Sequence, residues 1–586
     1  MNRPGWLDAS DLRIGLGCMR MSTDSDRDEV IARATIAAAV AAGVTVFDTA
    51  HAYGHGDAEL GHNERLLAGA LRDHGAAASV RIVTKGGMTR PDGGWVPDGR
   101  AKALRRDCEA SLAALGGLPI DLYLTHAPDS RTPWRTSVRA LARLRDEGLV
   151  RHVGLSNVNR GQLDEALELA PIAAVEVALG PHDDRALRGG IVERCDELQI
   201  TLIAHSPLGG ARRAAALARR GPLAEIAQTL GATPAEVALA WLLDLSPVVV
   251  PIPGARRPQT ARSAASAAAL ALDSGARTVL QRAFGGLRSP GAEAQRPTAR
   301  RDGDVVLVIG IPGAGKSVVA DEYAGRGYVR LNRDERGGSL RDLAEALDGE
   351  LSSGARRVVL DNTYLTRAAR SHVIEAANRH GLPARCVWLD TPLAQAQVNL
   401  VERILDLFGA LPTPDELRRL ARRHPGVLAP TSQMRAFREL ERPVADEGFA
   451  GVEAVDFARR PPADGRAGAG VFVAAAALSR PGWERALAQG DLHAPHLLFD
   501  WSPGGAPEVL ASDLARLAAA LDGPVQSVVC PHPGGPPTCW CRPPLPGLPL
   551  AFARAHQLDP ASSILIGTGP VHRNLAAALG ARYISV

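Results

Sequence analysis

Residues 304–317 read Asp-Val-Val-Leu-Val-Ile-Gly-Ile-Pro-Gly-Ala-Gly-Lys-Ser, an apolar strand that runs directly into a glycine-rich loop. The spacing from Gly310 to Ser317 fits G-x-x-x-x-G-K-S, the pattern of a phosphate-binding loop. Backbone amides of such a loop surround phosphate, its lysine reaches the β and γ oxygens, and its hydroxyl binds magnesium. The stretch predicts a parallel α/β nucleoside-triphosphate (P-loop NTPase) fold that binds ATP with Mg²⁺. The residues expected to bind them are Gly310, Gly313, Gly315, Lys316 and Ser317.

Lysine is rare in this chain, because only Lys85, Lys102 and Lys316 are lysines among the 67 Lys and Arg residues. Arginine is always charged, whereas the compact lysine ammonium can lose its proton. A lysine that persists in such a composition invites a chemical explanation beyond arginine-rich coding bias. Lys316 lies in the phosphate loop and Lys85 ends the segment Arg-Ile-Val-Thr-Lys, whereas Lys102 has no motif around it and is expected on the surface.

The composition is that of an ordinary globular protein with little net charge. The chain has 586 residues, 46% of them hydrophobic, with a formal net charge of +3, enough for about three to five domains. There is no global basic field, so any nucleic-acid binding would be local. We expect no signal peptide and no membrane partner, because no apolar run is long enough. Seven cysteines, three of them clustered late in the chain, favour a cytoplasmic protein with a metal site over disulfides.

Two polar segments rich in Pro, Gly and Arg, residues 287–303 and 459–469, have no periodic pattern and are predicted to be linkers. They divide the chain into domains at residues 1–290, 304–457 and 470–586. The first domain alternates short apolar segments with longer helical patterns, which predicts a (β/α)8 (TIM) barrel. Its candidate strands are 13–17, 45–50, 80–85, 121–126, 152–157, 173–178, 201–206 and 248–252. The other two domains also alternate strands with helices and are both predicted to be α/β.

Four polar residues fall at or just after the ends of predicted barrel strands, where barrel enzymes place their chemistry. They are Asp48, Tyr53, Lys85 and His126. A lysine ammonium favours phenolate and is expected to lower the pKa of a neighbouring tyrosine, which can then give a proton to a carbonyl oxygen as hydride reaches the carbon. In this scheme Asp48 keeps Lys85 charged and His126 orients the carbonyl.

In order and spacing these four residues resemble the aldo-keto reductase superfamily over about residues 10–285. Further matching pieces are Gly-Leu-Ser-Asn (154–157), His-Ser-Pro-Leu-Gly (205–209) and Ile-Pro-Gly-Ala-Arg-Arg (252–257). The resemblance implies NADPH- or NADH-dependent reduction of a small carbonyl substrate. It also implies that Ser156 and Asn157 hold the nicotinamide amide, and that Arg256, with Arg257, holds a cofactor phosphate.

Two positions depart from that family. The sixth strand usually carries a glutamine and, a few residues on, an aromatic that stacks on nicotinamide, whereas this chain has Glu176 and Leu179. Loss of the stacking residue is expected to loosen nicotinamide binding. The alternative to a working reductase is an inert barrel that retains the four residues.

In the middle domain the pieces Asn-Arg-Asp334 and Asp361-Asn-Thr follow the phosphate loop, with Ala429–Thr431 and Glu447–Phe449 later. Together they resemble the kinase domain of polynucleotide 5′-hydroxyl kinases over about residues 304–457. The resemblance implies that Asp334 is the general base that accepts the hydroxyl proton. It implies that Asp361 lies near magnesium or substrate.

A hydroxyl kinase also needs a cation that offsets the charge spread over the transferred phosphoryl group. Arg403 is the candidate, although a second arginine often found in that family two residues earlier is Val401 here. The pairs Arg418-Arg419 and Arg422-Arg423 are either a contact to a phosphate backbone or a solvated helix face. A small-molecule kinase of the same α/β class is the alternative, and substrate length distinguishes the two.

Near the end of the chain, Cys530-x-His532 and Cys539-x-Cys541 offer four ligands within twelve residues, a set that suits closed tetrahedral Zn²⁺. With Arg542-Pro-Pro-Leu-Pro-Gly, they resemble the zinc loop of haloacid-dehalogenase (HAD)-type phosphatases of the histidinol-phosphate and heptose-bisphosphate kind. The catalytic carboxylates of that family are missing, because the first strand runs into Ala474 and the late metal-binding position is Thr568. We therefore expect a HAD-like domain that is inactive as a phosphatase. Its zinc would either stabilise the fold or form a contact with RNA or a protein partner.

The three parts together predict a bifunctional protein that reduces a carbonyl and phosphorylates the 5′-OH ends of RNA or DNA. Reduction of an oxidised 5′-aldehyde end would produce the hydroxyl that the kinase needs, which suggests nucleic-acid end repair. The opposing hypotheses are a metabolic fusion of a reductase with a small-molecule kinase, and a nucleotide-gated scaffold without catalysis.

Overall fold

The computed structural model describes residues 6–8, 11–217, 219, 221–287, 303–459 and 464–586. They form two compact units, residues 1–292 and 293–586. Residues 288–302 of the first predicted linker (287–303) and residues 460–463 of the second (459–469) lie outside the described residues. No single helix of the described part is long and apolar enough to cross a membrane. One pair of helices, Pro222–Leu230 and Pro234–Leu245, passes the test of length and composition when taken together, but the pair is bent by 99° at its break.

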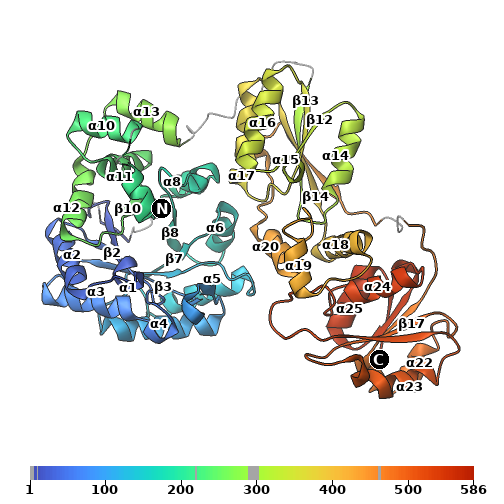
Figure 1. Ribbon diagram of the computed structural model, residues 1–586. Coiled ribbons are helices and arrows are strands. Elements are labelled where there is room, and N and C mark those ends of the chain that lie inside the picture. The colour runs from blue at the N-terminus through green and yellow to red at the C-terminus, as the bar shows by residue number, and fades with distance from the viewer. Residues whose placement is uncertain (1–5, 9–10, 218, 220, 288–302, 460–463) are drawn as a thin grey trace. The chain divides into compact units, whose positions relative to one another are not determined.

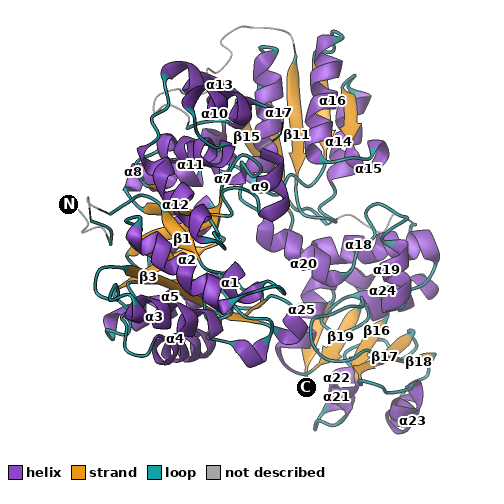
Figure 2. Cartoon of the chain, turned by 60° about the vertical axis from the view of Figure 1, so that its left-hand side comes forward, coloured by secondary structure: helices purple, strands orange, loops and turns teal. Residues whose placement is uncertain are grey.

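The first unit is a nearly closed barrel of eight parallel strands surrounded by helices (Figures 1 and 2), which confirms the predicted fold class. Each strand overlaps one predicted range. In barrel order they are β1 (Gly15–Gly17), β2 (Val46–Asp48), β3 (Arg81–Gly86), β6 (Leu122–Thr125), β7 (His152–Ser156), β8 (Ile172–Ala178), β9 (Thr201–His205) and β10 (Val249–Ile252). The two ends approach each other where Gly17 N–H donates to Pro253 O (3.1 Å).

Helices follow the strands because a parallel pair needs a long crossover connection. The principal helices of the barrel are α2 (Glu29–Ala41), α3 (His62–Asp73), α4 (Ala101–Leu115), α5 (Trp134–Asp146), α6 (Arg160–Leu167), α8 (Ile191–Leu198), α10 (Pro222–Leu230), α11 (Pro234–Leu245), α12 (Pro258–Ser266) and α13 (Ser274–Phe284). Local signals set their starts: Thr233 and Glu236 form a capping box at α11, with Pro234 at its first position.

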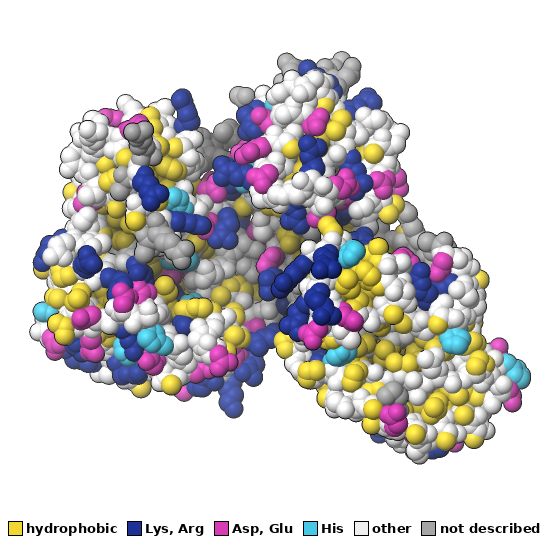
Figure 3. Space-filling view, in the orientation of Figure 1, with side chains coloured by type: hydrophobic (Ala, Val, Ile, Leu, Met, Phe, Trp, Pro, Cys, Tyr) yellow, Lys and Arg dark blue, Asp and Glu magenta, His cyan; other side chains and the backbone are white. Residues whose placement is uncertain are grey.

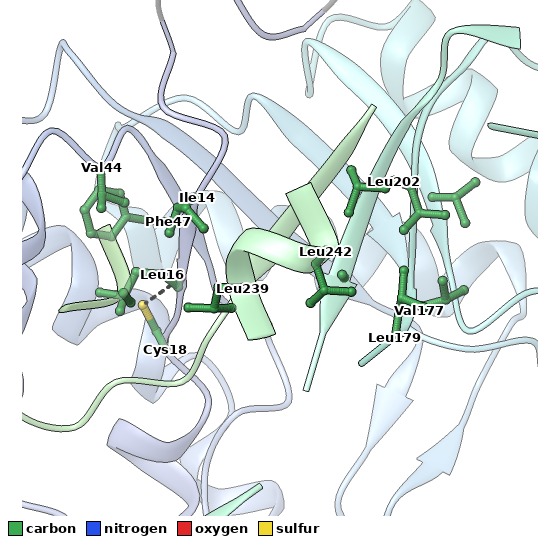
Figure 4. Close-up of a cluster of buried hydrophobic side chains, with 14 of the residues drawn as sticks. Ile14, Leu16, Cys18, Val44, Phe47, Val177, Leu179, Leu202, Leu239 and Leu242 are labelled. Carbon is green, nitrogen blue, oxygen red and sulfur yellow. Dashed lines mark hydrogen bonds between the residues drawn. The ribbon is translucent and has the colours of Figure 1, made fainter. Parts of the chain in front are cut away.

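Two layers of apolar side chains hold the barrel. Inside it, strand residues such as Val83, Leu124 and Ile203 form a small core. Outside it, a larger core lies between strands and helices. Figure 4 shows Leu239 and Leu242 of α11 in this outer layer, between Ile14 and Leu16 on one side and later-strand residues on the other. A packed interior leaves the ends of the strands as the place for a site.

The second unit contains two parallel five-stranded sheets. The first has the order β12 (Val329–Asn332), β13 (Arg357–Asp361), β11 (Asp304–Ile309), β14 (Ala384–Asp390), β15 (Gly451–Asp456). Its principal helices are α14 (Lys316–Gly325), α15 (Arg333–Arg336), α16 (Leu340–Ser352), α17 (Arg367–Arg379), α18 (Leu393–Phe408), α19 (Pro414–Leu420) and α20 (Pro430–Glu439). The phosphate-loop strand β11 is therefore central, with the strand of Asp361 paired directly to it.

The second sheet of this unit has the order β18 (Val525–Cys530), β17 (His496–Trp501), β16 (Val471–Ala474), β19 (Ile564–Gly567), β20 (Arg582–Ser585). Its helices are α21 (Ala475–Leu478), α22 (Trp483–Leu487), α23 (Ala511–Ala518), α24 (Gly547–Ala555) and α25 (Gly569–Leu579). Both sheets confirm the predicted α/β class.

The Glu447–Phe449 piece has a structural role in the first of these sheets. Glu447 holds the fully buried Arg370 of α17 through two hydrogen bonds of 2.6 Å each. Phe449 belongs to the buried core beneath the sheet. A paired and hydrogen-bonded guanidinium tolerates burial, so this motif supports the fold.

Candidate functional sites

The four residues predicted from the barrel sequence lie together at the carboxyl ends of its strands. Lys85 of β3 extends its ammonium toward β2, where it donates to a carboxylate oxygen of Asp48. Lys85 Nζ also donates to Thr49 O (3.1 Å) and lies 3.4 Å from Tyr53 Oη. The His126 ring meets the Tyr53 ring edge to face, with 5.7 Å between their centroids. The arrangement brings a phenol, an ammonium and an imidazole around one point.

A second carboxylate reaches the same ammonium. Glu176 of β8 places Oε2 3.2 Å from Lys85 Nζ, and both side chains are almost fully buried. The sequence identified Glu176 only as a departure at a cofactor position. Its ion pair was missed because it depends on β8 curving round to face β3 across the barrel.

Burial and these charges set the protonation of the cluster. Burial opposes the charge on Lys85, but Asp48 and Glu176 outweigh it and hold the pKa of Lys85 well above its usual value. Burial, followed by the charge of Glu176, raises the pKa of Asp48 to about 8, although Lys85 opposes the rise. The ammonium thus lies beside two carboxylates that repel each other.

The expectation that Lys85 lowers the pKa of Tyr53 below its usual value is wrong for this structure. Burial raises the pKa of Tyr53, and the two carboxylates add to the rise that Lys85 opposes. Burial also lowers the pKa of His126 well below its usual value, with Lys85 acting in the same direction. The site therefore holds a protonated phenol and a neutral imidazole.

A cavity of about 1110 Å³ opens above this cluster. Asp48, Tyr53, His126, Ser156, Asn157 and Glu176 line its inner end, and Arg256 and Arg257 line another part. Asn157 has a left-handed backbone (φ 57°) and its amide donates to His126 O (3.0 Å). Its Oδ1 lies 3.1 Å from His205 Nε2. The predicted cofactor-binding residues and the four-residue cluster thus share one cavity large enough for a dinucleotide and a small substrate.

The two arginines expected to hold a cofactor phosphate differ in their surroundings. Arg256 forms ion pairs with Asp24 (3.1 Å) and Asp26 (3.0 Å). Arg257 occupies the N-cap position of α12, without a side-chain hydrogen bond to the helix, and has no ion-pair partner among the described residues. A helix N-terminus beside an unpaired guanidinium suits an anion, so Arg257 is the more available of the two.

Leu179 does not line the cavity but lies in the outer apolar core, fully buried. An aromatic residue that the sequence analysis missed lies beside the cluster instead. Trp95, 44% exposed, packs its ring 6.2 Å from that of Tyr53 and 5.6 Å from that of His126, between centroids. The Arg90 guanidinium lies 3.6 Å from the indole centroid. The sequence signal that could have indicated this residue is the tryptophan in Gly-Gly-Trp, ten residues after Lys85 at the end of β3.

In the second unit the phosphate loop has the expected form. Lys316 folds back and donates to Gly310 O and Ile311 O, both at 3.0 Å. Gly313 and Gly315 have left-handed backbones (φ 87° and 94°), and a Cβ on Gly313 would lie 2.3 Å from Ala396 O. Burial lowers the pKa of Lys316 to about 8. Phosphate oxygens would give the ammonium anionic partners and raise this pKa again.

The carboxylates predicted near this loop lie at the same sheet edge. Asp361 ends β13, where it pairs in register with Val308 of β11. It accepts hydrogen bonds from Arg330 (2.6 Å) and Asn332 (3.0 Å). Asp334 lies in the short helix α15, and its side chain is 41% exposed. Asp361, Asp334 and Arg403 each affect the pKa of Lys316, which places all three charges around the phosphate loop.

Ser317 follows Lys316 in the first turn of α14. Arg403 lies on α18, with one guanidinium nitrogen 2.5 Å from where a Cβ on Gly426 would be. Val401, which replaces the second arginine of the resembled family, is fully buried in an apolar core that includes the C-terminal sheet. An arginine at this position would bury an unpaired charge, which explains the substitution.

The four predicted metal ligands converge at the end of β18. Their ligand atoms all lie within 4.8 Å of one another. The closest pairs are Cys530 Sγ to Cys539 Sγ (3.7 Å), Cys530 Sγ to Cys541 Sγ (3.3 Å), Cys530 Sγ to His532 Nδ1 (3.5 Å) and His532 Nδ1 to Cys541 Sγ (3.1 Å). Zinc bonds of about 2.3 Å to sulfur and 2.0 Å to nitrogen put tetrahedral ligands about 3.5–3.8 Å apart. The set fits a zinc ion with small adjustments.

The carboxyl edge of the C-terminal sheet has few carboxylates at its central strand ends. The central strand β16 ends at Ala474, and its neighbours β17 and β19 lead into Asp500–Trp501 and Thr568. Asp500 is the one carboxylate at these three strand ends. The expectation of a HAD-like domain without phosphatase activity stays a prediction.

Comparison with known proteins gives two family matches. The model described as aldo/keto reductase family matches residues 13–276, and an AAA domain model matches residues 305–407. An oxidoreductase of Schizosaccharomyces pombe is 31% identical over 268 residues, which is 45% of this chain and 83% of the relative.

Solved structures of aldo-keto reductases are also similar to part of the chain. A thermostable aldo-keto reductase bound to epalrestat is 30% identical and covers 46% of this chain and 94% of its own, with a TM-score of 0.40. An aldo/keto reductase of Klebsiella pneumoniae, solved with NADP and acetate, is 25% identical and covers 47% and 92%, with a TM-score of 0.41.

The carboxylate pair predicts an unusual pH dependence of barrel stability. The pKa of Asp48 is raised from 3.8 to about 8, so above about pH 4 the folded barrel retains a proton that the unfolded chain releases. The free energy of unfolding should therefore fall as the pH rises from about 4 towards 8. Glu176→Gln removes one cause of the raised pKa and should flatten this fall. Scanning calorimetry of the full chain at several pH values measures it.

Asp107→Asn is the matched control, because Asp107 is equally buried near the end of β3 but accepts the Gly87 N–H and pairs with Arg106, which stays charged over this pH range. It should leave the pH slope as in the wild type. Equal slopes in the wild type and Glu176→Gln would contradict the assigned carboxylate pair.

Proposed function

The chain belongs, through residues 13–276, to the aldo/keto reductase family, and we propose that its barrel reduces a carbonyl substrate with NADPH (or NADH). One observation carries this proposal. The Tyr53 phenol lies 3.4 Å from the buried Lys85 ammonium, at the inner end of a cavity that also contains His126, Ser156 and Asn157.

The nicotinamide cofactor, when bound, supplies the hydride that the carbonyl carbon receives. Tyr53 gives its proton to the carbonyl oxygen, so that the C=O group becomes a hydroxyl-bearing carbon. The charged Lys85 stabilises the phenolate left on Tyr53, and Asp48 with Glu176 keeps Lys85 charged. A neutral His126 donates a hydrogen bond that orients the carbonyl. Solvent then returns a proton to Tyr53.

The remaining cavity residues bind the cofactor in this proposal. Ser156 and Asn157 hold the nicotinamide amide, and Asn157 is already positioned by His126 O and His205. Arg257 binds a cofactor phosphate. Arg256 joins it when the phosphate displaces Asp24 and Asp26 from its guanidinium. Trp95 is not among the residues that line the cavity, but its ring lies beside those of Tyr53 and His126, where it can contact the substrate. Because Leu179 offers no ring to stack on nicotinamide, weak cofactor affinity is expected.

Removal of the Tyr53 hydroxyl tests the reductase. Tyr53→Phe should lower the turnover number by about 10²- to 10⁴-fold, the usual worth of a positioned acid. The assay is loss of reduced-nicotinamide absorbance with a panel of aldehydes. Tyr123→Phe is the matched control, because this buried tyrosine of β6 donates to Leu104 O and does not line the cavity. Equal rates in Tyr53→Phe and the wild type would refute the assignment.

For the P-loop domain we propose ATP-dependent phosphorylation of the 5′-OH ends of RNA or DNA. Asp334 accepts the proton of the attacking hydroxyl, whose oxygen bonds to the γ-phosphorus while the bond to ADP breaks. Lys316 and Arg403 offset the charge of the transferred group. Ser317, with Asp361 near it, would hold Mg²⁺, which would offset the negative charge of the phosphates. The support is the placement of these charges around one loop.

A polymeric substrate is favoured by the surface near α19. Arg418, Arg419, Arg422 and Arg423 are all exposed, and Figure 3 shows Lys and Arg side chains gathered over this region. Of these four arginines, only Arg418 forms an ion pair among the described residues, and its partner is Asp415. Unpaired arginines in a row suit phosphodiesters. Reduction of a 5′-aldehyde by the barrel would supply the hydroxyl for this step. The competing candidate is a small-molecule kinase.

Substrate length separates these candidates. Transfer of labelled γ-phosphate should be faster to 5′-OH oligonucleotides than to nucleosides or sugars, and Asp334→Asn should reduce it by about 10²- to 10⁴-fold. Glu335→Gln, the neighbouring exposed carboxylate, is the matched control. Replacing Arg419, Arg422 and Arg423 with alanine should raise KM for oligonucleotides alone. Faster transfer to nucleosides would favour the small-molecule kinase.

A further inference from the structure

Helix α18 contacts the phosphate loop along one face. Asn399 Nδ2 donates to Gly313 O (2.8 Å). The backbone of the helix comes so close at Ala396 that only a glycine fits at position 313. One turn further on, Arg403 affects the pKa of Lys316. The position of α18 therefore sets both the shape of the loop and the placement of the arginine.

A second face of α18, which shares Leu400 with the first, is buried against the C-terminal sheet. Leu400, Val401, Ile404 and Leu405 belong to one apolar core with side chains of β16, β17, α24 and α25. Two ion pairs tie the same helix to this region: Glu402 to Arg466 (2.8 Å), and Asp406 to Arg554. Arg466 is only 6% exposed, so its pair with Glu402 is shielded from water.

The metal-ligand loop contributes the largest side chain of this shared core. Trp540 stands between Cys539 and Cys541 and is 2% exposed. Its indole N–H donates to Leu428 O (3.0 Å), in the segment between α19 and α20. Residues 531–538 (Pro-His-Pro-Gly-Gly-Pro-Pro-Thr) provide no helix or strand that would hold this loop in place. Ligation of the flanking cysteines would do so.

We propose that a zinc ion held by Cys530, His532, Cys539 and Cys541 fixes Trp540 against the α18–α20 segment and thereby positions α18 over the phosphate loop. The C-terminal domain then acts as a metal-dependent support for the nucleotide site of its neighbour. Trp540 is a positioning residue, because it touches neither the loop nor the ligand space above it. The inference rests on the P-loop domain binding nucleotide, but the state of α18 can be measured without nucleotide.

Hydrogen exchange of the full chain, read by mass spectrometry, tests this coupling. Removal of zinc by a chelator, and separately Cys539→Ser, should speed exchange in residues 393–408. Both should weaken binding of a fluorescent ATP analogue by roughly 2- to 30-fold, the range of coupling between packed sites. Zinc content, measured by atomic emission, should be one ion per chain before treatment.

Variants at Trp540 separate positioning from metal binding. Trp540→Ala should keep the zinc yet speed exchange in α18, and the milder Trp540→Phe, which loses only the N–H donated to Leu428, should show a smaller effect of the same sign. Trp483→Phe is the matched control, because Trp483 lies in the other apolar core of the same domain. Unchanged exchange in β16 and β17 would show that the effect is not general unfolding.

The proposal would be overturned if hydrogen exchange in α18 were equally slow before and after zinc removal. It would also be overturned if the purified chain contained no zinc. A chain whose α18 responds to zinc but binds no ATP would refute the nucleotide function and leave the coupling intact.

Discussion

Parallel strand pairing is the constraint on which the rest of this structure depends. All three large sheets are parallel, so each strand must be followed by a crossover, and every strand ends at the same edge of its sheet. Residues distant in the sequence therefore meet at one edge. Asp48, Lys85 and Glu176 come from three different strands of the barrel. In the P-loop sheet, Asp361 ends β13, and Lys316 begins the helix that follows the neighbouring strand β11.

The sequence predicted much of this arrangement because the signals for parallel α/β folds are local. Apolar segments at regular intervals located all eight barrel strands, and the loop from Gly310 to Ser317 located the central strand of the next sheet. Residues at strand ends followed from the same pattern. The cysteine and histidine spacing placed four ligand atoms in one cluster.

Features that depend on packing across the fold could not be predicted in the same way. The ion pair of Glu176 with Lys85 requires the barrel to close. Burial, with the two carboxylates adding to it, outweighs the lowering effect of Lys85 on the pKa of Tyr53. The position of Trp95 depends on a short hairpin. Val401, where the resembled kinase family often has an arginine, is buried in a core shared with the C-terminal sheet. Each of these features has its cause in an element distant in the sequence or outside the motif.

Hydride transfer to a carbonyl at the carboxyl edge of the barrel can be followed with an isotope label. The full chain would be given an aldehyde and nicotinamide cofactor that carries deuterium at the transferable C4 position. The account predicts one carbon-bound deuterium in the alcohol for each cofactor oxidised. An alcohol without deuterium, or no alcohol although the cofactor binds, would contradict it.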